Sequence, residues 1–180
     1  MLMKQFFKKW MLLLLVGIPS CIYAQTKYKV TSPSGKLRLE VATGNEITYS
    51  VIHEEDTMIA PSPISMTLDN GNVWGEKAKL SGTSRKSVDE MIPSPFYRAN
   101  ELRDHYNELT LRFKKDWNVE FRAYNDGIAY RFVNRGKKPF HVIDEVSDYC
   151  FPSDMVASVP YVRSGKDGDY NSQFFNSFEN

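Results

Sequence analysis

Residues 119–132 of this 180-residue chain read VEFRAYNDGIAYRF, and this stretch decides the fold. Every second side chain on either side of its centre is apolar: Val119, Phe121 and Ala123 before it, and Ile128, Tyr130 and Phe132 after it. Asn125-Asp126-Gly127 separates the two runs, and Asp-Gly between alternating runs is the strongest short-range signal for a β-hairpin. The stretch therefore predicts two antiparallel strands, each with one buried face.

The same period of two recurs along the chain. Apolar and polar side chains alternate in three further runs, whose one-face residues are Leu37, Leu39 and Val41, then Ile47, Tyr49 and Val51, then His105, Asn107, Leu109, Leu111 and Phe113. Gly44-Asn45 between the first two runs predicts a second hairpin. Pro61 and Pro63 are predicted to lie outside any central strand, because proline cannot donate a ladder hydrogen bond. With no amphipathic helical period beyond residue 24, the residues predict an all-β sandwich or barrel.

The first 24 residues have the three-part pattern of a secretory signal peptide. Three lysines precede an uncharged apolar core, MLLLLVG at residues 11–17, and Ala24 offers a small residue for cleavage. The apolar run breaks at Pro19, short of the roughly 20 residues that a membrane-spanning helix needs. We therefore expect export to the periplasm, a mature domain over residues 25–180 and no membrane span.

Two cysteines bear on processing and on redox chemistry. Residues 18–21, IPSC, loosely resemble a bacterial lipobox, so a lipid anchor through Cys21 stays open beside cleavage after Ala24. Cleavage after Ala24 would leave Cys150 as the only cysteine, without an internal disulfide partner. Its neighbours Tyr149 and Phe151 predict a small buried hydrophobe rather than a catalytic thiol.

The charge balance argues against a nucleic-acid partner. The full chain has 23 Lys and Arg against 22 Asp and Glu, and removing the three lysines of the leader leaves 20 against 22. The sequence has no basic stripe of the kind that binds phosphate backbones. Its aromatic content of 13% suits both sheet packing and contact with sugars.

Five segments, in order, resemble the N-terminal domain of glycoside hydrolase family 97. They are residues 32–37 (SPSGKL), 61–64 (PSPI), 84–90 (SRKSVDE), 103–109 (RDHYNEL) and 120–132 (EFRAYNDGIAYRF). The stretch at 103–109 is the most specific of them, and beyond Phe140 the resemblance thins.

The resemblance implies a galactose-mutarotase-like β-super-sandwich, followed in the family by a (β/α)₈ barrel that carries the catalytic carboxylates. Family members hydrolyse α-glucosides or α-galactosides in the periplasm and bind calcium in the active site. The family's N-terminal domain is longer than residues 25–180, so the sandwich is expected to be incomplete at its C-terminus. A barrel needs ~200 residues or more, so we assign no catalytic residue and no cofactor to this chain alone.

Two motifs suggest metal or acid–base chemistry, but a structural interpretation suits them better. His105 and Glu108 would share a face of a helix, whereas residues three apart on a strand point to opposite faces. Residues 167–171, DGDYN, begin like an EF-hand calcium loop, yet Ser172 stands where the turn needs glycine and Phe178 where a bidentate glutamate is needed. We interpret them as a hydrogen-bonded strand histidine and a polar turn.

Glu179 is the one candidate metal ligand. In the resembled family, one calcium ligand is a glutamate that the N-terminal domain contributes from an aromatic-rich stretch, and Phe174, Phe175 and Phe178 make such a stretch here. Oxygen donors suit Ca²⁺, although a solvated acid near the chain end is an open alternative. One carboxylate cannot hold Ca²⁺ without ligands from a barrel, so we expect no tight binding by this chain alone.

The resemblance thus predicts a non-catalytic N-terminal module of a family 97 enzyme, which supports a barrel and contacts an α-linked glycoside. A stand-alone periplasmic carbohydrate-binding β-sandwich is the first alternative, since such domains can hold sugars on a concave sheet. A degraded gene product without function is the second. Activity is not expected for the chain by itself.

Overall fold

Alternating apolar residues form ten strands in the computed structural model, which describes residues 25–94 and 100–156. The strands are β1 (Thr26–Thr31), β2 (Leu37–Thr43), β3 (Ile47–His53), β4 (Asp56–Leu68), β5 (Val73–Trp74), β6 (Leu80–Pro93), β7 (Glu101–Phe113), β8 (Trp117–Tyr124), β9 (Ile128–Asn134) and β10 (Val142–Ser147). Over these two ranges the structure has no helix, and hence none long and apolar enough to cross a membrane.

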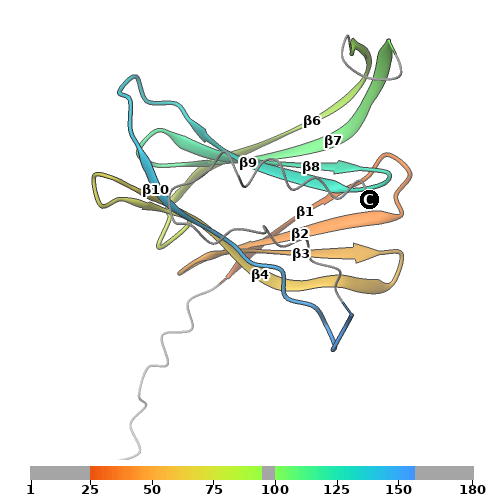
Figure 1. The fold of residues 1–180 in the computed structure, drawn as a ribbon, viewed down its shortest axis with the longest axis horizontal. Coiled ribbons are helices and arrows are strands. Elements are labelled where there is room, and N and C mark those ends of the chain that lie inside the picture. The colour runs from red at the N-terminus through yellow and green to blue at the C-terminus, as the bar shows by residue number, and fades with distance from the viewer. Residues whose placement is uncertain (1–24, 95–99, 157–180) are drawn as a thin grey trace, which may run out of the picture.

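The strands form two antiparallel sheets that lie over each other as the layers of a sandwich (Figure 1). The first sheet has the order β1-β2-β3-β4-β10, with the short β5 also paired to β4. The second sheet has the order β6-β7-β8-β9. Neighbouring strands are consecutive in sequence except for β10, which returns from the second sheet to pair with β4. The predicted all-β sandwich is confirmed.

Turn residues set the register of both predicted hairpins. Between β8 and β9, Tyr124 N donates to Gly127 O at 2.8 Å, and Phe121 lies opposite Tyr130. Between β2 and β3, Val41 lies opposite Tyr49. A slip of one residue would turn each apolar set to the opposite face, so this register is what converts the alternation into a core.

The core between the sheets is centred on apolar side chains with at most 1% of their surface exposed: Leu39, Val41, Ile47, Tyr49 and Ile64 from the first sheet, and Leu109, Leu111, Val119, Phe121 and Ala123 from the second. Burying a large apolar side chain completely stabilises a fold by about 1.5–3 kcal/mol. Tyr49 keeps its polar end satisfied by donating to the Asp148 carbonyl at 3.2 Å. Burial is the main reason that its pKa rises to about 12.

An aromatic column joins the two sheets at one end of the sandwich. Trp117 of the second sheet stacks on Phe113 with a centroid distance of 4.2 Å, and on Trp74 of the first sheet at 5.5 Å with nearly parallel rings. Phe140 packs edge-on against Trp74 at 5.0 Å. Aromatic pairs of this kind add about 0.5–1.5 kcal/mol beyond the area they bury.

The two long sides of the sandwich are closed differently. On the β1–β6 side, Arg85 donates to the Lys29 carbonyl, and Asn107 Nδ2 donates to the Thr31 carbonyl at 2.8 Å. On the β9–β10 side, the hydroxyls of Tyr130 and Ser147 lie 2.8 Å apart. A cavity of about 530 Å³ lies on this second side, between the edges of the two sheets.

Pro61 and Pro63 both lie inside β4, yet the expectation that neither sits in a central strand holds at this position. β4 is flanked by β3 on one side, but it pairs with β10 only from Ile64 to Leu68. In a strand, the N and C=O of one residue point to the same side. Asp148 N donates to the Pro63 carbonyl at 3.4 Å, so the ring nitrogen of Pro63 also points to the side of β10. Pro63 lies beyond the last residue of β4 that pairs with β10. Here β4 is an edge strand, where a missing donor costs little.

Gly75 makes the junction after β5 possible and can be tested directly. Its φ is +112°, and a Cβ there would lie 2.5 Å from the Ile64 carbonyl oxygen and 2.9 Å from Ser65 Cα. Gly35 also has a positive φ, of +79°, but a Cβ there would meet nothing within 4 Å. The two glycines therefore separate the cost of backbone conformation from the cost of a clash.

We expect Gly35→Ala to lower the free energy of unfolding by about 1–2 kcal/mol, the cost of a left-handed alanine. Gly75→Ala should cost about 2–3 kcal/mol more, because backbone atoms of β4 must also move. Urea denaturation of the purified variants, followed by tryptophan fluorescence, measures both values. Equal losses in the two variants would contradict the close approach at Gly75.

Candidate functional site

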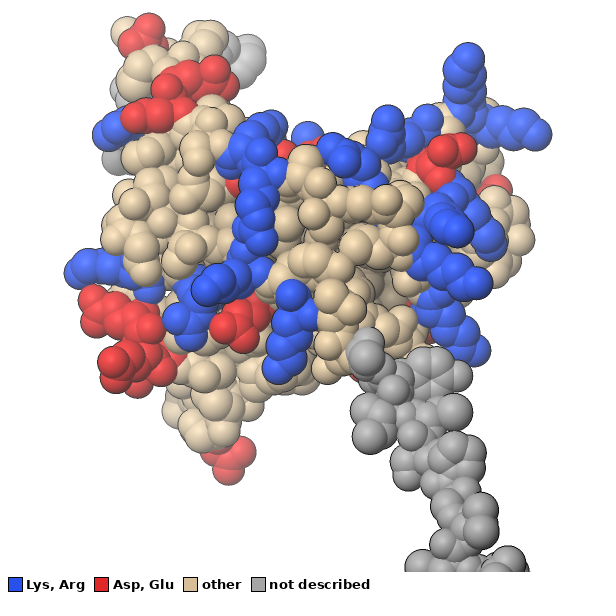
Figure 2. Space-filling model, turned by 180° about the vertical axis from the view of Figure 1, so that it is seen from behind, with Lys and Arg blue, Asp and Glu red and all other residues tan. Residues whose placement is uncertain are grey.

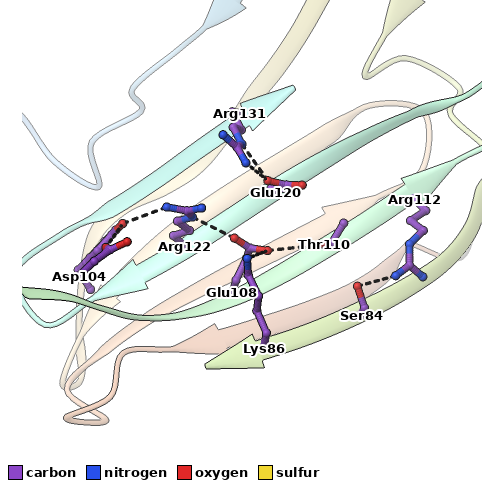
Figure 3. Close-up of polar contacts among 10 residues, drawn as sticks. Ser84, Lys86, Asp104, Glu108, Thr110, Arg112, Glu120, Arg122 and Arg131 are labelled. Carbon is purple, nitrogen blue, oxygen red and sulfur yellow. Dashed lines mark hydrogen bonds and ion pairs between the residues drawn. The ribbon is translucent and has the colours of Figure 1, made fainter. Parts of the chain in front are cut away.

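The outer face of the second sheet carries the densest set of charged contacts in the described chain. The alternation of β7 sends Leu109, Leu111 and Phe113 into the core. The intervening residues Glu108, Thr110 and Arg112 therefore point to the opposite face of the sheet. We call this surface the outer face, and Figure 3 shows its polar contacts.

Glu108 lies at the centre of the outer face. Strand register places Lys86 of β6 and Arg122 of β8 on either side of it. Its Oε2 lies 2.9 Å from Arg122 Nε, and its Oε1 lies 3.3 Å from Lys86 Nζ (Figure 3). Only 4% of Glu108 is exposed, so this carboxylate is buried between two cations.

The ring of Tyr106 packs against the two cations that hold this buried carboxylate. The Arg122 guanidinium lies 4.1 Å from the ring centroid of Tyr106, which is itself 3% exposed. Burial opposes the charge on Arg122, but hydrogen bonds to Tyr124 and Glu108 outweigh it, so the pKa of the guanidinium is raised. Tyr124 donates to Asp104 Oδ1 at 3.1 Å, and burial is the main cause of its raised pKa.

A second set of contacts lies further along the same strands. Arg131 Nη2 lies 2.7 Å from Glu120 Oε2, and Arg112 Nη2 donates to Ser84 Oγ at 2.7 Å (Figure 3). Asn118, between these two contacts in the register, is 7% exposed, and its Oδ1 accepts no hydrogen bond from the described residues. A buried acceptor of this kind is costly to leave unpaired.

The outer face is poorly suited to glycoside cleavage. A retaining glycosidase needs two carboxyl groups about 5–5.5 Å apart, one to attack the sugar and one to protonate the leaving group. Glu108 is enclosed by Lys86 and Arg122, and Glu120 is held by Arg131. Both carboxylates are thus neutralised by their own neighbours. The geometry makes a rigid polar surface rather than a pair of free acids.

The placement of His105 on a strand is confirmed, whereas its contact with Asp89 is longer than a hydrogen bond. His105 lies in β7 opposite Asp89, and its Nε2 is 3.9 Å from Asp89 Oδ2. Arg103 contacts the same carboxylate through two hydrogen bonds of 2.7 Å, the main cause of the lowered pKa of Asp89. Glu108 points to the other face, as predicted. In the described ranges, no group of three or more His, Cys, Asp or Glu side chains is arranged to hold a metal ion.

The prediction of a buried Cys150 is wrong. The thiol is exposed, and Tyr149 and Phe151 are 61% and 50% exposed. The backbone explains this outcome: Cys150 N donates to Ser62 Oγ at 2.8 Å, and its carbonyl accepts from Ala60 N at 2.7 Å. These bonds tie the segment after β10 to β4 by its main chain, which leaves the side chains outside.

Several predicted features lie outside the described residues. They are the signal peptide at 1–24 with Cys21, the loop at 167–171 and the candidate calcium ligand Glu179. The buried Glu108 was not foreseen from the sequence. The pairing of β7 with β6 and with β8 places Lys86, Glu108 and Arg122 in one row across the sheet. The register of these two hairpins is therefore the signal that could have indicated the buried carboxylate.

Comparison with known proteins gives a consistent set of relatives. A family model described as Glycosyl-hydrolase 97 N-terminal matches residues 30–180. A retaining alpha-galactosidase of Bacteroides thetaiotaomicron is 72% identical over 169 residues, which is 94% of this chain but 26% of that protein. The chain thus spans about a quarter of the length of this curated relative.

Two solved structures share the fold. The crystal structure of a beta-arabinopyranosidase superposes with a TM-score of 0.61 at 26% identity, over 69% of this chain and 21% of that one. A Glycoside Hydrolase Family 97 enzyme from Pseudoalteromonas sp. strain K8, in complex with panose, has a TM-score of 0.60 at 18% identity, over 69% of this chain and 20% of that one. At that identity the likeness concerns the fold alone.

Because Glu108 is buried, we expect its partner Arg122 to contribute more to the free energy of unfolding than Arg131, the partner of Glu120. Arg122→Met leaves Glu108 with the half-exposed Lys86 as its one cationic partner among the described residues, and should lower the free energy of unfolding by about 2–4 kcal/mol. Arg131→Met removes the partner of Glu120 at a more exposed position and should cost less than about 1 kcal/mol. Urea denaturation at pH 7 measures both.

A double variant sharpens this test. Replacing both members of the pair, in Glu108→Leu with Arg122→Met, removes the uncompensated charge and should recover at least half of the loss. If Arg122→Met costs no more than Arg131→Met, then Glu108 does not depend on Arg122.

Proposed function

The chain belongs to the glycosyl-hydrolase 97 N-terminal family, and from this membership we propose that it acts as the non-catalytic N-terminal module of an enzyme that hydrolyses α-galactosides. The observation that carries the proposal is the 72% identity to a retaining alpha-galactosidase, over 94% of this chain. Membership of the family alone would also allow α-glucosides as substrates, but 72% identity to an alpha-galactosidase favours α-galactosides. The module would support a catalytic barrel and contact the glycoside from its edge.

The neutralised carboxylates of the outer face support a non-catalytic role. Glu108 and Glu120 are each bound to basic side chains, so neither is available as nucleophile or general acid. Purified chain should therefore release no nitrophenol from a nitrophenyl α-galactoside. The barrel of the parent enzyme would supply the catalytic pair.

A stand-alone carbohydrate-binding protein is the second candidate, and the cavity on the β9–β10 side favours it. Three tyrosines, Tyr49, Tyr130 and Tyr149, line this space of about 530 Å³ together with Glu145 and Ser147. Ligand pockets typically have about 300–1,000 Å³ and combine apolar walls with a few polar groups. A saturable rise in melting temperature with melibiose would favour this candidate over the module.

The module proposal can be tested with a chimaera. The Bacteroides thetaiotaomicron alpha-galactosidase lacking the region that aligns with this chain should be inactive. The same enzyme carrying residues 25–180 of this chain in that place should hydrolyse a nitrophenyl α-galactoside within about ten-fold of the native kcat/KM, because 72% of the aligned residues are identical. Activity without the region, or a folded but inactive chimaera, would contradict the proposal.

Calcium enters the proposal through Glu179. We propose that its carboxylate becomes a calcium ligand when a barrel contributes the remaining oxygen donors. Glu179→Gln in the chimaera should therefore raise the Ca²⁺ concentration needed for half-maximal calcium binding, measured by calorimetry. Sub-micromolar calcium binding by the isolated chain would contradict the need for a barrel.

Export is the remaining part of the proposal. Residues 1–24 would direct the chain to the periplasm, with cleavage before Gln25, unless Cys21 is lipidated. Mass spectrometry of the N-terminal peptide, from protein produced in a Bacteroides host, distinguishes a free Gln25 from an acylated Cys21. A retained Met1 would contradict both.

A further inference from the structure

A second cavity, of about 370 Å³, lies at the end of the sandwich that holds the aromatic column. Two segments distant in sequence supply its lysines: Lys77 and Lys79 follow β5, and Lys114 and Lys115 form the turn between β7 and β8. Trp74 and Trp117 form its floor. We call this space the lysine cavity. Figure 2 shows basic side chains gathered at this end of the molecule, on its right.

The charges of the lysine cavity are not balanced as those of the outer face are. Within the described residues, none of its four lysines forms an ion pair; Lys115 Nζ instead lies 3.5 Å from Asn72 Oδ1. Glu76 is the one acidic residue in the lining. Four exposed lysines thus line one cavity beside a single acidic residue, and an anion bound there would meet a net positive charge.

The backbone holds the two lysine segments together. Lys114 N donates to the Lys79 carbonyl at 2.9 Å, and Lys77 N donates to the Asn45 carbonyl at 2.6 Å. Lys77 and Lys115 both have positive φ, of 46° and 72°, a conformation that is unfavourable for residues with a Cβ. The surrounding structure thus maintains two unfavourable backbone conformations, both at lysines that line the cavity.

The size of the lysine cavity indicates a ligand larger than a simple ion. Its volume corresponds to roughly a dozen water molecules at about 30 Å³ each, so an inorganic anion would fill a small part of it. The faces of Trp74 and Trp117 are occupied, since the two indoles stack on each other, Trp117 also stacks on Phe113, and Phe140 packs edge-on against Trp74. A ligand would therefore be held by charge and by hydrogen bonds from polar groups at the rim, such as Asn72.

We propose that the lysine cavity binds a saccharide that carries an oxyanion, either a phosphate or a carboxylate group. Lysine ammonium groups bind such oxyanions through charge-assisted hydrogen bonds. The hydroxyl groups of the sugar body fill the remaining volume and bond to the Asn72 and Glu76 side chains. This site is separate from the outer face, and the choice of a galactose body for the probes rests on the proposed function.

Calorimetry and thermal denaturation test the proposal with four probes: α-galactose 1-phosphate, galacturonic acid, neutral galactose and inorganic phosphate. At least one of the two anionic sugars should bind saturably and raise the melting temperature. It should bind more tightly than galactose and, for the sugar phosphate, more tightly than inorganic phosphate. The double variant Lys77→Gln, Lys114→Gln should bind the anionic sugar about ten-fold or more weakly, since two charge-assisted contacts are lost.

Lys137→Gln with Lys138→Gln is the matched control. These two lysines follow β9 and are exposed, but they do not line the cavity, and the pair removes the same net charge. The control should keep its affinity within about two-fold, as expected where only screened charges change. The proposal is overturned if neither anionic sugar binds, if galactose or inorganic phosphate binds as tightly, or if both double variants lose affinity equally. The melting temperature of each variant without ligand shows whether it is folded.

Discussion

Trp117 stacks on Trp74 across the two sheets and on Phe113 within its own sheet, and this contact holds one end of the sandwich together. Hydrophobic burial is non-directional, whereas stacked indoles also fix how the sheets lie over each other. Trp74 reaches its position because Gly75, next in the chain, lets the backbone pass against β4 without a side chain. The floor of the lysine cavity is the same pair of indoles, so the core and the proposed site share one structural element.

The register of β7 and β8 determines both faces of the second sheet at once. It places Leu109 opposite Phe121 in the core and Glu108 opposite Arg122 on the outer face. A slip of one residue would expose the apolar pair and bury charges without partners. Buried ion pairs add little net stability compared with apolar packing. We therefore interpret the Glu108 contacts as a constraint on pairing as much as a source of stability.

Local patterns were sufficient to predict five of the ten strands in the described residues, β2, β3, β7, β8 and β9, since Asp126-Gly127 and the alternation around Phe121 and Tyr130 depend only on neighbouring residues. They were insufficient where an outcome depends on strands that pair from elsewhere. Pro63 is tolerated inside β4 because the β10 ladder ends beside it, and no local feature of the sequence reports that. Cys150 is exposed because its main chain, not its side chain, is bound to β4. The lysine cavity joins segments that are more than thirty residues apart in the sequence.

The two charged regions of the molecule differ in a way that bears on what each can contact. On the outer face, Glu108 and Glu120 are matched by arginines at 2.9 and 2.7 Å, so another protein domain could cover these two carboxylates without leaving either of them unpaired. Protein interfaces avoid such charges because their desolvation is costly. The lysine cavity has an excess of positive charge that a protein surface would have to neutralise, and a small anionic ligand does so at lower entropic cost than an ordered acidic loop. Charge balance therefore distinguishes the two regions. The paired carboxylates of the outer face suit contact with a neighbouring domain, and the excess positive charge of the lysine cavity suits a small anionic ligand.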